Sequence, residues 1–315
     1  MRLLKYKYVR HKPHSNIILH TEVLTRASSI KNIILTSFVS KRIALNISRG
    51  PSIVAERVLS NIHQLKTKTA ISVDWILNVN SENSWKKIDF SKDLLIIGPN
   101  VEFNKFYIRE KTANFANVRI LVPSPWVIPV LKEQISWFTG EFIVWQSDID
   151  FNFWKAPSKK DKKKIMIYRK YDESDADFNL VMQLCQDLGI NFQIITYGKY
   201  SRRQFKRALS ESFAAVWLGT TESQGIALLE CWAMDVPTFV REKNEFLDLS
   251  NGKRFPSSSA PYLNSECGKF FKSEEITREL LSRFLAEAKF LSPRGYVLNN
   301  FSKKESLNRL NILLT

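Results

Sequence analysis

Apolar positions in the second half of the chain form two patterns, short continuous runs and longer segments with helical spacing. One stretch shows both. Its apolar run 214–218 predicts a buried strand. Small and polar residues fill 219–225, and from Ile226 apolar residues recur with the spacing of one helix face. Pro237 ends the predicted helix, and another apolar run begins at Thr238, so the stretch predicts a strand, a loop, a helix and a second strand.

The same alternation of strands and helices continues along the chain and predicts an α/β fold with parallel sheets. Strands are predicted at 32–36, 71–77, 94–97, 118–122, 142–145, 165–168, 192–195, 214–218, 238–240 and 267–271. Helices with an apolar face are predicted after the strands at 32–36, 118–122, 165–168, 192–195 and 214–218 and, after the last strand, at 274–290 and 302–314.

A chain of 315 residues is long enough for two domains of ordinary size. The segment 155–164 (KAPSKKDKKK) is polar and strongly basic, so we place the linker between the domains there. A first domain is predicted at 32–154 and a second at 165–300. A basic extension at 1–31 precedes the first domain, and a C-terminal helix at 301–315 follows the second.

The chain carries 47 Lys and Arg residues against 31 Asp and Glu residues, a net charge of +16. Such a charge favours nucleic acid, an anionic membrane surface or an anionic substrate as a partner. The sequence has no zinc-finger spacing, no aromatic RNA-binding strand and no basic heptad helix, so we expect no nucleic acid. The extension 1–31 can lie on anionic lipid or form an edge hairpin, and a Lys- and Asn-rich genome would also explain the charge.

Three features bear on where the protein works. No apolar run approaches the roughly 20 residues that span a bilayer. The first residues lack the long apolar core of a secretory leader. The wide spacing of Cys185, Cys231 and Cys267 predicts single core thiols in a reducing compartment rather than a disulfide framework or a metal site. We therefore expect a cytoplasmic protein, with basic segments that allow peripheral contact with a membrane.

Two carboxylates frame the loop and helix that follow the run 214–218. Glu222 lies in the loop and Glu230 lies eight residues later in the helix, with Gly225 at the junction. The first N–H groups of a helix have no partner within the helix and, together with the helix dipole, attract an anion. The junction therefore suits a phosphorylated ligand. The ordinary alternative is one Glu near a helix N-terminus and a second, solvated Glu on the helix.

The order Glu-Ser-x-Gly, then a second Glu eight residues after the first, then Pro237, resembles the E-x7-E motif of retaining glycosyltransferases with the GT-B fold, of the group 1/family 4 type. The resemblance extends over about 165–271. It implies two Rossmann-like domains that face each other across a cleft, with the nucleotide-sugar donor on the second and the acceptor on the first. It also implies that the helix at 301–315 packs back on the domains.

The resemblance implies roles for individual residues of this motif. Glu222 would lie beside the transferred sugar, and Glu230 would accept hydrogen bonds from the ribose hydroxyls of the donor. The other residues at the junction that are expected to contact the donor are Ser223, Gln224, Gly225 and Ile226.

Two basic residues follow the predicted strand 165–168, where this family typically keeps an Arg and a Lys for the pyrophosphate. Arg169 and Lys170 are adjacent, whereas the family's spacing is longer, so the sequence leaves open which of them reaches the ligand. A guanidinium or an ammonium at a strand end would stabilise the leaving diphosphate.

Two further glycines fall where domains of this family contact a donor. Gly198 follows a predicted strand at a place where nucleoside bases commonly stack, with Tyr197 or Tyr200 as the expected platform. Gly50, followed by Pro51, stands where the family has paired glycines in a phosphate loop, although Gly-Pro is also an ordinary turn.

Two short acidic motifs raise the question of a metal. Asp148 and Asp150 spell D-x-D, the metal-binding pattern of the other glycosyltransferase fold, and Asp175 and Asp177 repeat it. We interpret both as chance matches, because the E-x7-E class neutralises the diphosphate with basic side chains. No metal is expected, and no cofactor beyond the nucleotide-sugar that serves as donor substrate.

The sequence therefore predicts a retaining, metal-independent glycosyltransferase. It would move a sugar from a nucleotide-sugar to a glycan or lipid-linked acceptor, in cell-surface polysaccharide or glycoconjugate synthesis. Two alternatives stay open. One is a sugar-nucleotide epimerase or a phosphorylase on the same fold. The other is a basic protein that binds nucleic acid or glycan on a degenerate GT-B scaffold.

Overall fold

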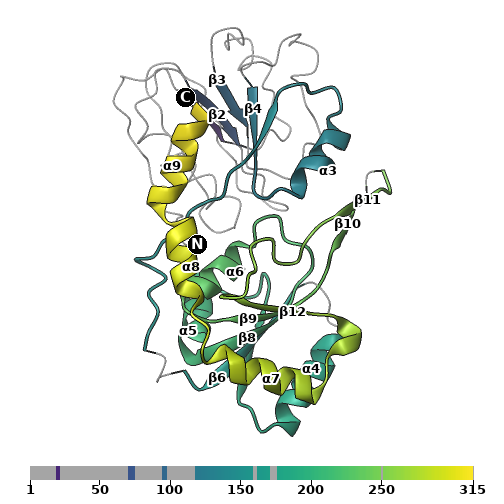
Figure 1. The fold of residues 1–315 in the computed structure, drawn as a ribbon, viewed down its shortest axis with the longest axis vertical. Coiled ribbons are helices and arrows are strands. Elements are labelled where there is room, and N and C mark those ends of the chain that lie inside the picture. Colours follow the sequence, from purple (N-terminus) through teal and green to yellow (C-terminus); the bar gives the residue numbers. More distant parts are fainter. Residues whose placement is uncertain are drawn as a thin grey trace, which may run out of the picture. The chain divides into compact units, whose positions relative to one another are not determined.

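The computed structural model describes residues 19–21, 70–74, 94–97, 118–158, 162–170, 176–249 and 251–314. The chain divides into two units, which Figure 1 shows as ribbons. Unit 1 comprises Met1–Ser147 together with Ser306–Thr315, and unit 2 comprises Asp148–Glu305. Among the described residues, no helix combines the length and the apolar character needed to cross a membrane.

In the described part of unit 1, five strands form a sheet in which every neighbouring pair is parallel. Its strands lie in chain order: β1 (Leu19–Thr21), β2 (Ala70–Asp74), β3 (Leu94–Ile97), β4 (Val118–Val122) and β5 (Glu141–Val144). The strands predicted at 94–97, 118–122 and 142–145 are confirmed, and β2 confirms the first part of the strand predicted at 71–77. The strand predicted at 32–36 lies outside the described residues.

Two described helices belong to this unit wholly or in part. Helix α3 (Val127–Gln134) follows β4. Helix α9 (Lys303–Leu314) begins in unit 2 and continues into unit 1. There, the Trp145 Nε1 donates to the Ser306 carbonyl at 3.3 Å, and the Ser306 hydroxyl donates to the Gln146 carbonyl at 3.3 Å. The end of the chain therefore completes unit 1.

Unit 2 contains a second five-stranded parallel sheet. Its strands are β6 (Lys164–Arg169), β7 (Phe192–Thr196), β8 (Ser212–Leu218), β9 (Thr238–Arg241) and β12 (Gly268–Phe271). Their order in space is β12-β9-β8-β6-β7, so the chain runs from β6 outward to β7 and then crosses to β8 on the other side of β6. Open α/β sheets bind ligands at the carboxyl ends of the strands where the order reverses, here between β6 and β8.

Helices cover both faces of this sheet (Figure 1). Residues Ile165–Tyr168 of β6 are all buried because both faces are covered. Met166 and Tyr168 belong to the core on one face, and Ile165 and Ile167 to the core on the other. The first face carries α5 (Arg202–Glu211), α6 (Ile226–Ala233) and α8 (Pro293–Phe301); the second carries α4 (Ala176–Asp187) and α7 (Arg278–Ala288). The predicted α/β class with parallel, Rossmann-like sheets is confirmed.

Local sequence explains where several helices begin. Helix α5 starts at a capping box, in which the Ser201 hydroxyl accepts from the Gln204 N–H at 3.2 Å and the Gln204 Oε1 accepts from the Ser201 N–H at 2.8 Å. Helix α7 starts at Thr277, whose Oγ1 accepts an N–H of the first turn at 3.2 Å. A separate 3-10 turn, η3 (Ser273–Glu275), precedes it, so the helix is shorter than the predicted 274–290.

One glycine is required by strand pairing. Gly268 begins β12 with a φ of 144° and pairs with Thr238 of β9. A Cβ on Gly268 would lie 1.8 Å from the carbonyl oxygen of Thr238. Since the obstructing atom belongs to the backbone of the neighbouring strand, it cannot rotate away, and only glycine fits.

The segment that enters unit 2 is packed against it. The Ile149 N–H donates to the Phe301 carbonyl at 2.8 Å, and Trp154 is fully buried. Lys162 is also buried, and its ammonium donates to two backbone carbonyls that follow α6, at 2.6 and 2.9 Å. The chain therefore joins unit 2 before the segment 155–164, in which the sequence places the linker.

The sequence did not predict helix α8, nor the antiparallel hairpin of β10 (Glu245–Leu247) and β11 (Arg254–Pro256). The three cysteines, in contrast, are free and buried, as their spacing predicted.

Candidate functional site

The candidate site lies at the carboxyl edge of the unit 2 sheet, at the reversal between β6 and β8. Lys170 follows β6, the loop 219–225 follows β8, and Tyr197 and Gly198 follow β7. Gly198 turns the chain there with a φ of 77°. Because all five strands are parallel, these segments meet at one edge. The topology thus gathers predicted residues that lie far apart in the sequence.

At the centre of this edge, Lys170 and Glu222 form an ion pair. The Lys170 Nζ lies 3.0 Å from the Glu222 Oε1, and the two side chains are 10% and 17% exposed. Burial raises the pKa of Glu222, while the charge and the hydrogen bond of Lys170 act in the opposite direction. An ammonium that holds a carboxylate in a shielded place can hold a phosphate oxygen there in the same way.

Arg169 points to the other face of the sheet, because successive side chains of a strand alternate. Its Nε donates to the Thr196 Oγ1 at 3.1 Å, and its guanidinium carbon lies 4.3 Å from the centroid of the Phe178 ring. Of the two basic residues between which the sequence did not decide, Lys170 contacts Glu222, whereas Arg169 contacts Thr196 and Phe178.

The loop enters α6 through Gly225. This residue is the N-cap of α6, with a φ of 72° and a ψ of 48° in the left-handed region. A Cβ there would lie 3.7 Å from the Glu222 Cβ. The Glu222 N–H donates to the Ser258 carbonyl at 2.9 Å, which fixes the loop on its outer side. The other predicted residues of the junction differ in burial: Ser223 and Ile226 are half-buried, and Gln224 is buried.

Glu230 lies inside α6 and is only 7% exposed. The pKa of Tyr200 is raised to about 12, first by burial and then by the negative charges of Glu230 and Glu222, against the effect of its hydrogen bond with Tyr168. Both carboxylates therefore act on one hydroxyl group. The two Glu residues of the motif belong to the same small region of the structure.

Aromatic rings lie beside these carboxylates. Tyr168 stacks on Trp217 with ring centroids 3.8 Å apart, and its hydroxyl lies 3.5 Å from that of Tyr200. Tyr197 is 43% exposed, and the Lys170 Nζ lies 5.0 Å from its ring centroid. Tyr197 is accessible to a ligand, whereas Tyr200 packs against the core. Sequence reasoning did not select Tyr168, because it reads as one more member of an apolar strand.

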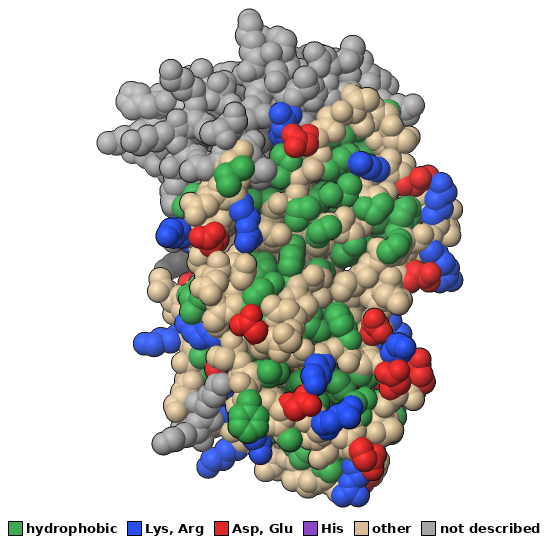
Figure 2. Space-filling model, in the orientation of Figure 1, with side chains coloured by type: hydrophobic (Ala, Val, Ile, Leu, Met, Phe, Trp, Pro, Cys, Tyr) green, Lys and Arg blue, Asp and Glu red, His purple; other side chains and the backbone are tan. Residues whose placement is uncertain are grey.

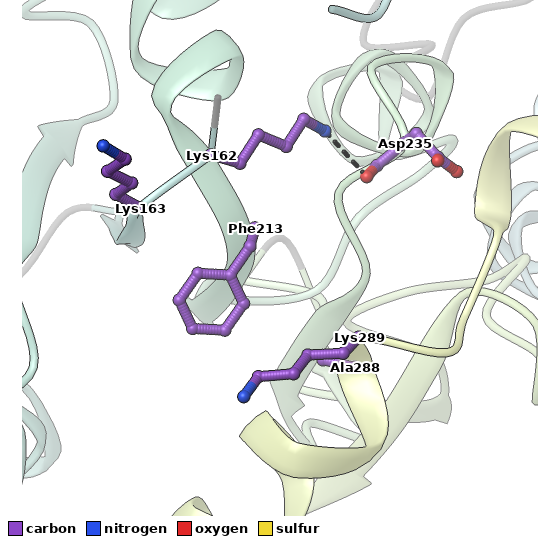
Figure 3. A pocket seen from close by; sticks show the side chains of 6 residues that line it. All are labelled: Lys162, Lys163, Phe213, Asp235, Ala288 and Lys289. Carbon is purple, nitrogen blue, oxygen red and sulfur yellow. Dashed lines mark hydrogen bonds between the residues drawn. The ribbon is translucent and has the colours of Figure 1, made fainter. Parts of the chain in front are cut away.

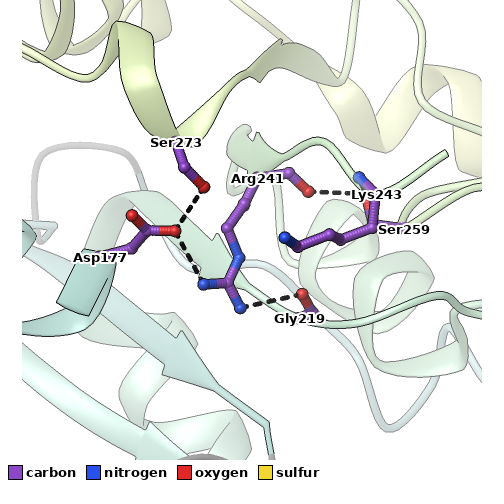
Figure 4. A network of polar contacts seen from close by, with 6 residues as sticks. All are labelled: Asp177, Gly219, Arg241, Lys243, Ser259 and Ser273. Carbon is purple, nitrogen blue, oxygen red and sulfur yellow. Dashed lines mark hydrogen bonds and ion pairs between the residues drawn. The ribbon is translucent and has the colours of Figure 1, made fainter. Parts of the chain in front are cut away.

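A second buried cation supports the loop (Figure 4). Arg241, the last residue of β9, is 7% exposed, and it donates to the Asp177 Oδ2 at 2.8 Å and to the Gly219 carbonyl at 3.3 Å. The Ser273 hydroxyl donates to the same Asp177 oxygen at 2.6 Å. Burial raises the pKa of Asp177, but these hydrogen bonds outweigh it and lower that pKa. Since Gly219 begins the loop that carries Glu222, Arg241 ties this loop to α4.

The backbone around Arg241 is held as well. The Ser259 hydroxyl donates to the Arg241 carbonyl at 2.7 Å and accepts the Lys243 N–H at 3.1 Å (Figure 4). The neighbouring carbonyl, that of Ser258, receives the Glu222 N–H. The loop is thus held from two sides. Sequence reasoning missed this network, and its one signal was a basic residue at the end of an apolar strand.

The D-x-D residues have contacts of their own. The Asp150 Oδ1 accepts the Phe153 N–H at 3.1 Å, and its Oδ2 lies 3.5 Å from Arg202. Within the described ranges, no group of three or more His, Cys, Asp or Glu side chains is arranged to hold a metal ion. Gly50 and Asp175 lie outside the described residues.

Comparisons with known proteins find similarity in structure only. No protein-family model matches the chain, and no curated protein matches it in sequence. The chain is similar to a sucrose-phosphate synthase from Thermosynechococcus elongatus, with 11% identity and a TM-score of 0.45 over 84% of this chain and 76% of that one. It is also similar to a TarM mutant from S. aureus in complex with fondaparinux, α-GlcNAc-glycerol and UDP. The identity is 12% and the TM-score is 0.49, over 83% of this chain and 59% of that one. A third similar structure is the catalytic domain of starch synthase IV from Arabidopsis thaliana, bound to ADP and acarbose. The identity is 9% and the TM-score is 0.45, over 90% of this chain and 83% of that one.

The chain spans 59% of the length of that TarM structure. All three TM-scores are under one half, and the identities are 9% to 12%. These similarities therefore do not decide the function, and the fold assignment rests on the two parallel sheets.

A separate pocket of about 360 Å³ lies at the opposite, amino edge of the unit 2 sheet (Figure 3). It is lined by Lys162, Lys163, Phe213, Asp235, Ala288 and Lys289. Its lysines stand near helix ends: Lys162 donates to carbonyls after α6, and Lys289 is the C-cap of α7. Cations are favoured at such ends. The fold therefore explains the charge of this pocket without a ligand.

Proposed function

We propose that the chain is a glycosyltransferase that uses a nucleotide-sugar donor, transfers the sugar with retention and needs no metal ion. The acceptor is a glycan or a lipid-linked glycan, and the setting is cell-surface polysaccharide or glycoconjugate synthesis on the cytoplasmic side. The observation that carries this proposal is the Lys170–Glu222 pair beside the N-terminus of α6, at the strand-order reversal of a parallel sheet. This edge offers a cation for a diphosphate and carboxylates for hydroxyl groups.

In the proposed reaction, the donor diphosphate lies between Lys170 and the first N–H groups of α6. Both favour negative charge, so they stabilise the diphosphate as the anomeric C–O bond breaks and its electron pair moves onto the leaving oxygen. Arg169 adds positive charge at the end of β6. Glu222 lies beside the sugar, where its charge stabilises an oxocarbenium-like transition state. We assign no general base. The acceptor hydroxyl oxygen forms its bond to the anomeric carbon on the face that the diphosphate leaves, and the departing phosphate takes the proton of this hydroxyl.

The remaining contacts in this proposal hold the nucleoside and the donor. Glu230 accepts hydrogen bonds from the ribose hydroxyls. The base stacks on Tyr197 next to Gly198, because this ring is exposed at the same edge. The residues proposed to surround the diphosphate and sugar are Ser223, Gln224, Gly225 and Ile226.

A thermal-shift screen against nucleoside diphosphates and their sugars tests the donor, since a ligand that binds only the folded state raises the unfolding midpoint. Glu230→Ala should weaken the affinity for the ligand found by about 1–3 kcal/mol, the range for hydrogen bonds to a charged group. Glu279→Ala, which changes an exposed glutamate of α7, is the matched control and should leave the affinity unchanged. An unaltered affinity in Glu230→Ala would remove that residue from the donor site.

Product analysis tests the reaction itself. NMR of the anomeric proton should show that the product keeps the donor's configuration, and an inverted product would contradict retention. Transfer should survive EDTA. If EDTA abolishes transfer and Mg²⁺ or Mn²⁺ restores it, the reaction needs a metal ion, and Asp148 and Asp150 become the candidate ligands. Conversion of the nucleotide-sugar without transfer to any acceptor would favour the epimerase alternative.

A further inference from the structure

Helix α5 contains charges that lower its own stability. Its first two residues, Arg202 and Arg203, are cations, and its first turn contains no acidic residue. The N-terminus of a helix carries partial positive charge, so cations are unfavourable there. Lys206 and Arg207 lie four residues after Arg202 and Arg203, a spacing at which like charges repel. Helix formation therefore does not explain why these four residues are basic.

Arg202 and Lys206 form the inner row of these cations, and contacts within the fold offset their positive charge. Arg202 lies 3.5 Å from the Asp150 carboxylate, and its guanidinium carbon lies 4.0 Å from the centroid of the Phe153 ring. The Lys206 Nζ lies 4.8 Å from the centroid of the same ring. These two residues thus have a structural partner within unit 2.

Arg203 and Arg207 form the outer row, and they have no such partner in the part of the chain that the structure describes. Arg203 and Arg207 are exposed, and their guanidinium groups make no contact there with a carboxylate or a ring. The apolar residues of α5 face the core, so its outer face is basic and carries no apolar side chain to insert into a bilayer. Figure 2 shows Lys and Arg side chains projecting at the left margin of unit 2, at the height of α5 in Figure 1.

We propose that the basic face of α5, defined as Arg202, Arg203, Lys206 and Arg207, docks on an anionic lipid surface. Residues that oppose the stability of their own element indicate a role outside folding. Guanidinium groups suit the phosphates of lipid headgroups, and without an apolar anchor the contact is electrostatic and reversible. Since α5 begins shortly after Tyr197, docking holds the candidate site close to the lipid. The docking does not depend on the proposed transfer reaction.

The surroundings of the face favour lipid over nucleic acid. Proteins that hold single strands stack the bases on exposed aromatic rings. Two rings contact these cations among the described residues. Phe153 is half-buried and contacts both Arg202 and Lys206, and Trp154, which contacts Arg202, is fully buried. A row of charges without a stacking platform fits a surface of phosphates.

Co-sedimentation with vesicles measures this docking on the full chain. Phosphatidylcholine vesicles that contain phosphatidylglycerol should bind the protein, whereas pure phosphatidylcholine vesicles should not. A basic residue at an anionic surface contributes about fivefold to binding, so Arg203→Gln with Arg207→Gln should weaken it about 25-fold. The same double variant should unfold at an unchanged or higher temperature, because it removes repulsion within α5. A purely structural role for these arginines predicts the opposite.

The matched control is Arg278→Gln with Arg283→Gln, which removes two exposed arginines from α7. It should weaken vesicle binding by less than about threefold, since only long-range charge is lost. Three results would overturn the proposal: no vesicle binding by the wild type, unchanged binding by the α5 double variant, or equal losses in both double variants. Tighter binding of single-stranded RNA than of vesicles, lost in the α5 variant, would overturn it in favour of nucleic acid.

Discussion

At the scale of single residues, the Lys170–Glu222 pair has opposite consequences for binding and for reaction. The Lys170 ammonium lies 3.0 Å from the Glu222 carboxylate. A diphosphate that binds at this edge has to compete with that carboxylate for the same ammonium. Under the proposed function, Glu222 therefore weakens the binding of the donor and promotes the transfer of its sugar.

Glu222→Gln should separate these two effects. Without the competing charge, the affinity for a nucleoside diphosphate should rise about tenfold, as expected when a charge-assisted contact is released to the ligand. Transfer should fall by about 10²–10³, the loss typical of a removed transition-state interaction. Calorimetry and initial rates measure the two quantities. Glu211→Gln is the control, because its partner Lys164 lies at a similar 2.8 Å in an exposed pair. Similar changes in both variants would contradict the assignment.

Asp177→Asn tests the support of the loop. Loss of one partner of a largely buried ion pair should lower the free energy of unfolding by about 3 kcal/mol at neutral pH. Because hydrogen bonds from Arg241 and Ser273 hold the Asp177 pKa below its ordinary value of 3.8, the pair stabilises the fold fully above pH 3.8. This stabilisation disappears as the pH falls through the lowered pKa.

Urea unfolding across pH measures the effect of Asp177→Asn. The difference from the wild type should be largest at neutral pH and should shrink below pH 3.8. Glu245→Gln, which breaks an exposed pair with Arg254, should change the free energy of unfolding by no more than about 0.5 kcal/mol. A difference for Asp177→Asn that does not vary with pH would mean that its charge is not what stabilises the loop.

At the scale of elements, the extent of burial decides which helices and strands the sequence predicts and which it misses. Strands β6, β8 and β9 were predicted because they are covered on both faces, so their apolar runs are continuous. Helix α8 was missed because it buries only Pro293, Val297 and Phe301, too few for a clear helical period. The strands β10 and β11 have three residues each, which is too short for an alternating pattern.

The candidate site follows the same logic. Glu222 and Glu230 stand in one continuous motif, which local sequence reveals. The choice between Arg169 and Lys170 depends on which face of β6 each side chain takes, and that is set by the pairing of the strands. The Arg241 network joins residues of three distant elements, so no local pattern predicts it.

Gly268→Ala should test the close contact between β12 and β9. The new methyl group would meet the Thr238 carbonyl at 1.8 Å, so the sheet has to distort, at a cost of about 3 kcal/mol or more. The control is Gly295→Ala in α8, where the added Cβ would meet no atom within 4 Å. That change should be neutral or stabilise by up to about 1 kcal/mol, because alanine favours helix. Equal unfolding midpoints for the two variants would refute the contact.

At the scale of the whole molecule, the two units differ in continuity. Unit 2 is one continuous segment, whereas unit 1 needs both the first part of the chain and its last ten residues, Ser306–Thr315. Leu310, in this last segment, is fully buried, and Ile312 is 73% exposed. Leu310→Ala should therefore destabilise the protein by about 2–4 kcal/mol. Ile312→Ala should change the stability by no more than about 0.5 kcal/mol. Thermal unfolding that shows equal losses would mean that α9 contributes no buried face.

Gly268 also offers a landmark for recognising distant relatives of this chain. When sequences have diverged far, an alignment has few fixed points. Residues that touch a ligand change as substrates diverge, whereas this glycine is required by the distance between two neighbouring strands. A relative with the same strand pairing should keep it whatever reaction it performs. An alignment that sets a bulkier residue opposite Gly268 has therefore lost register somewhere between β9 and β12.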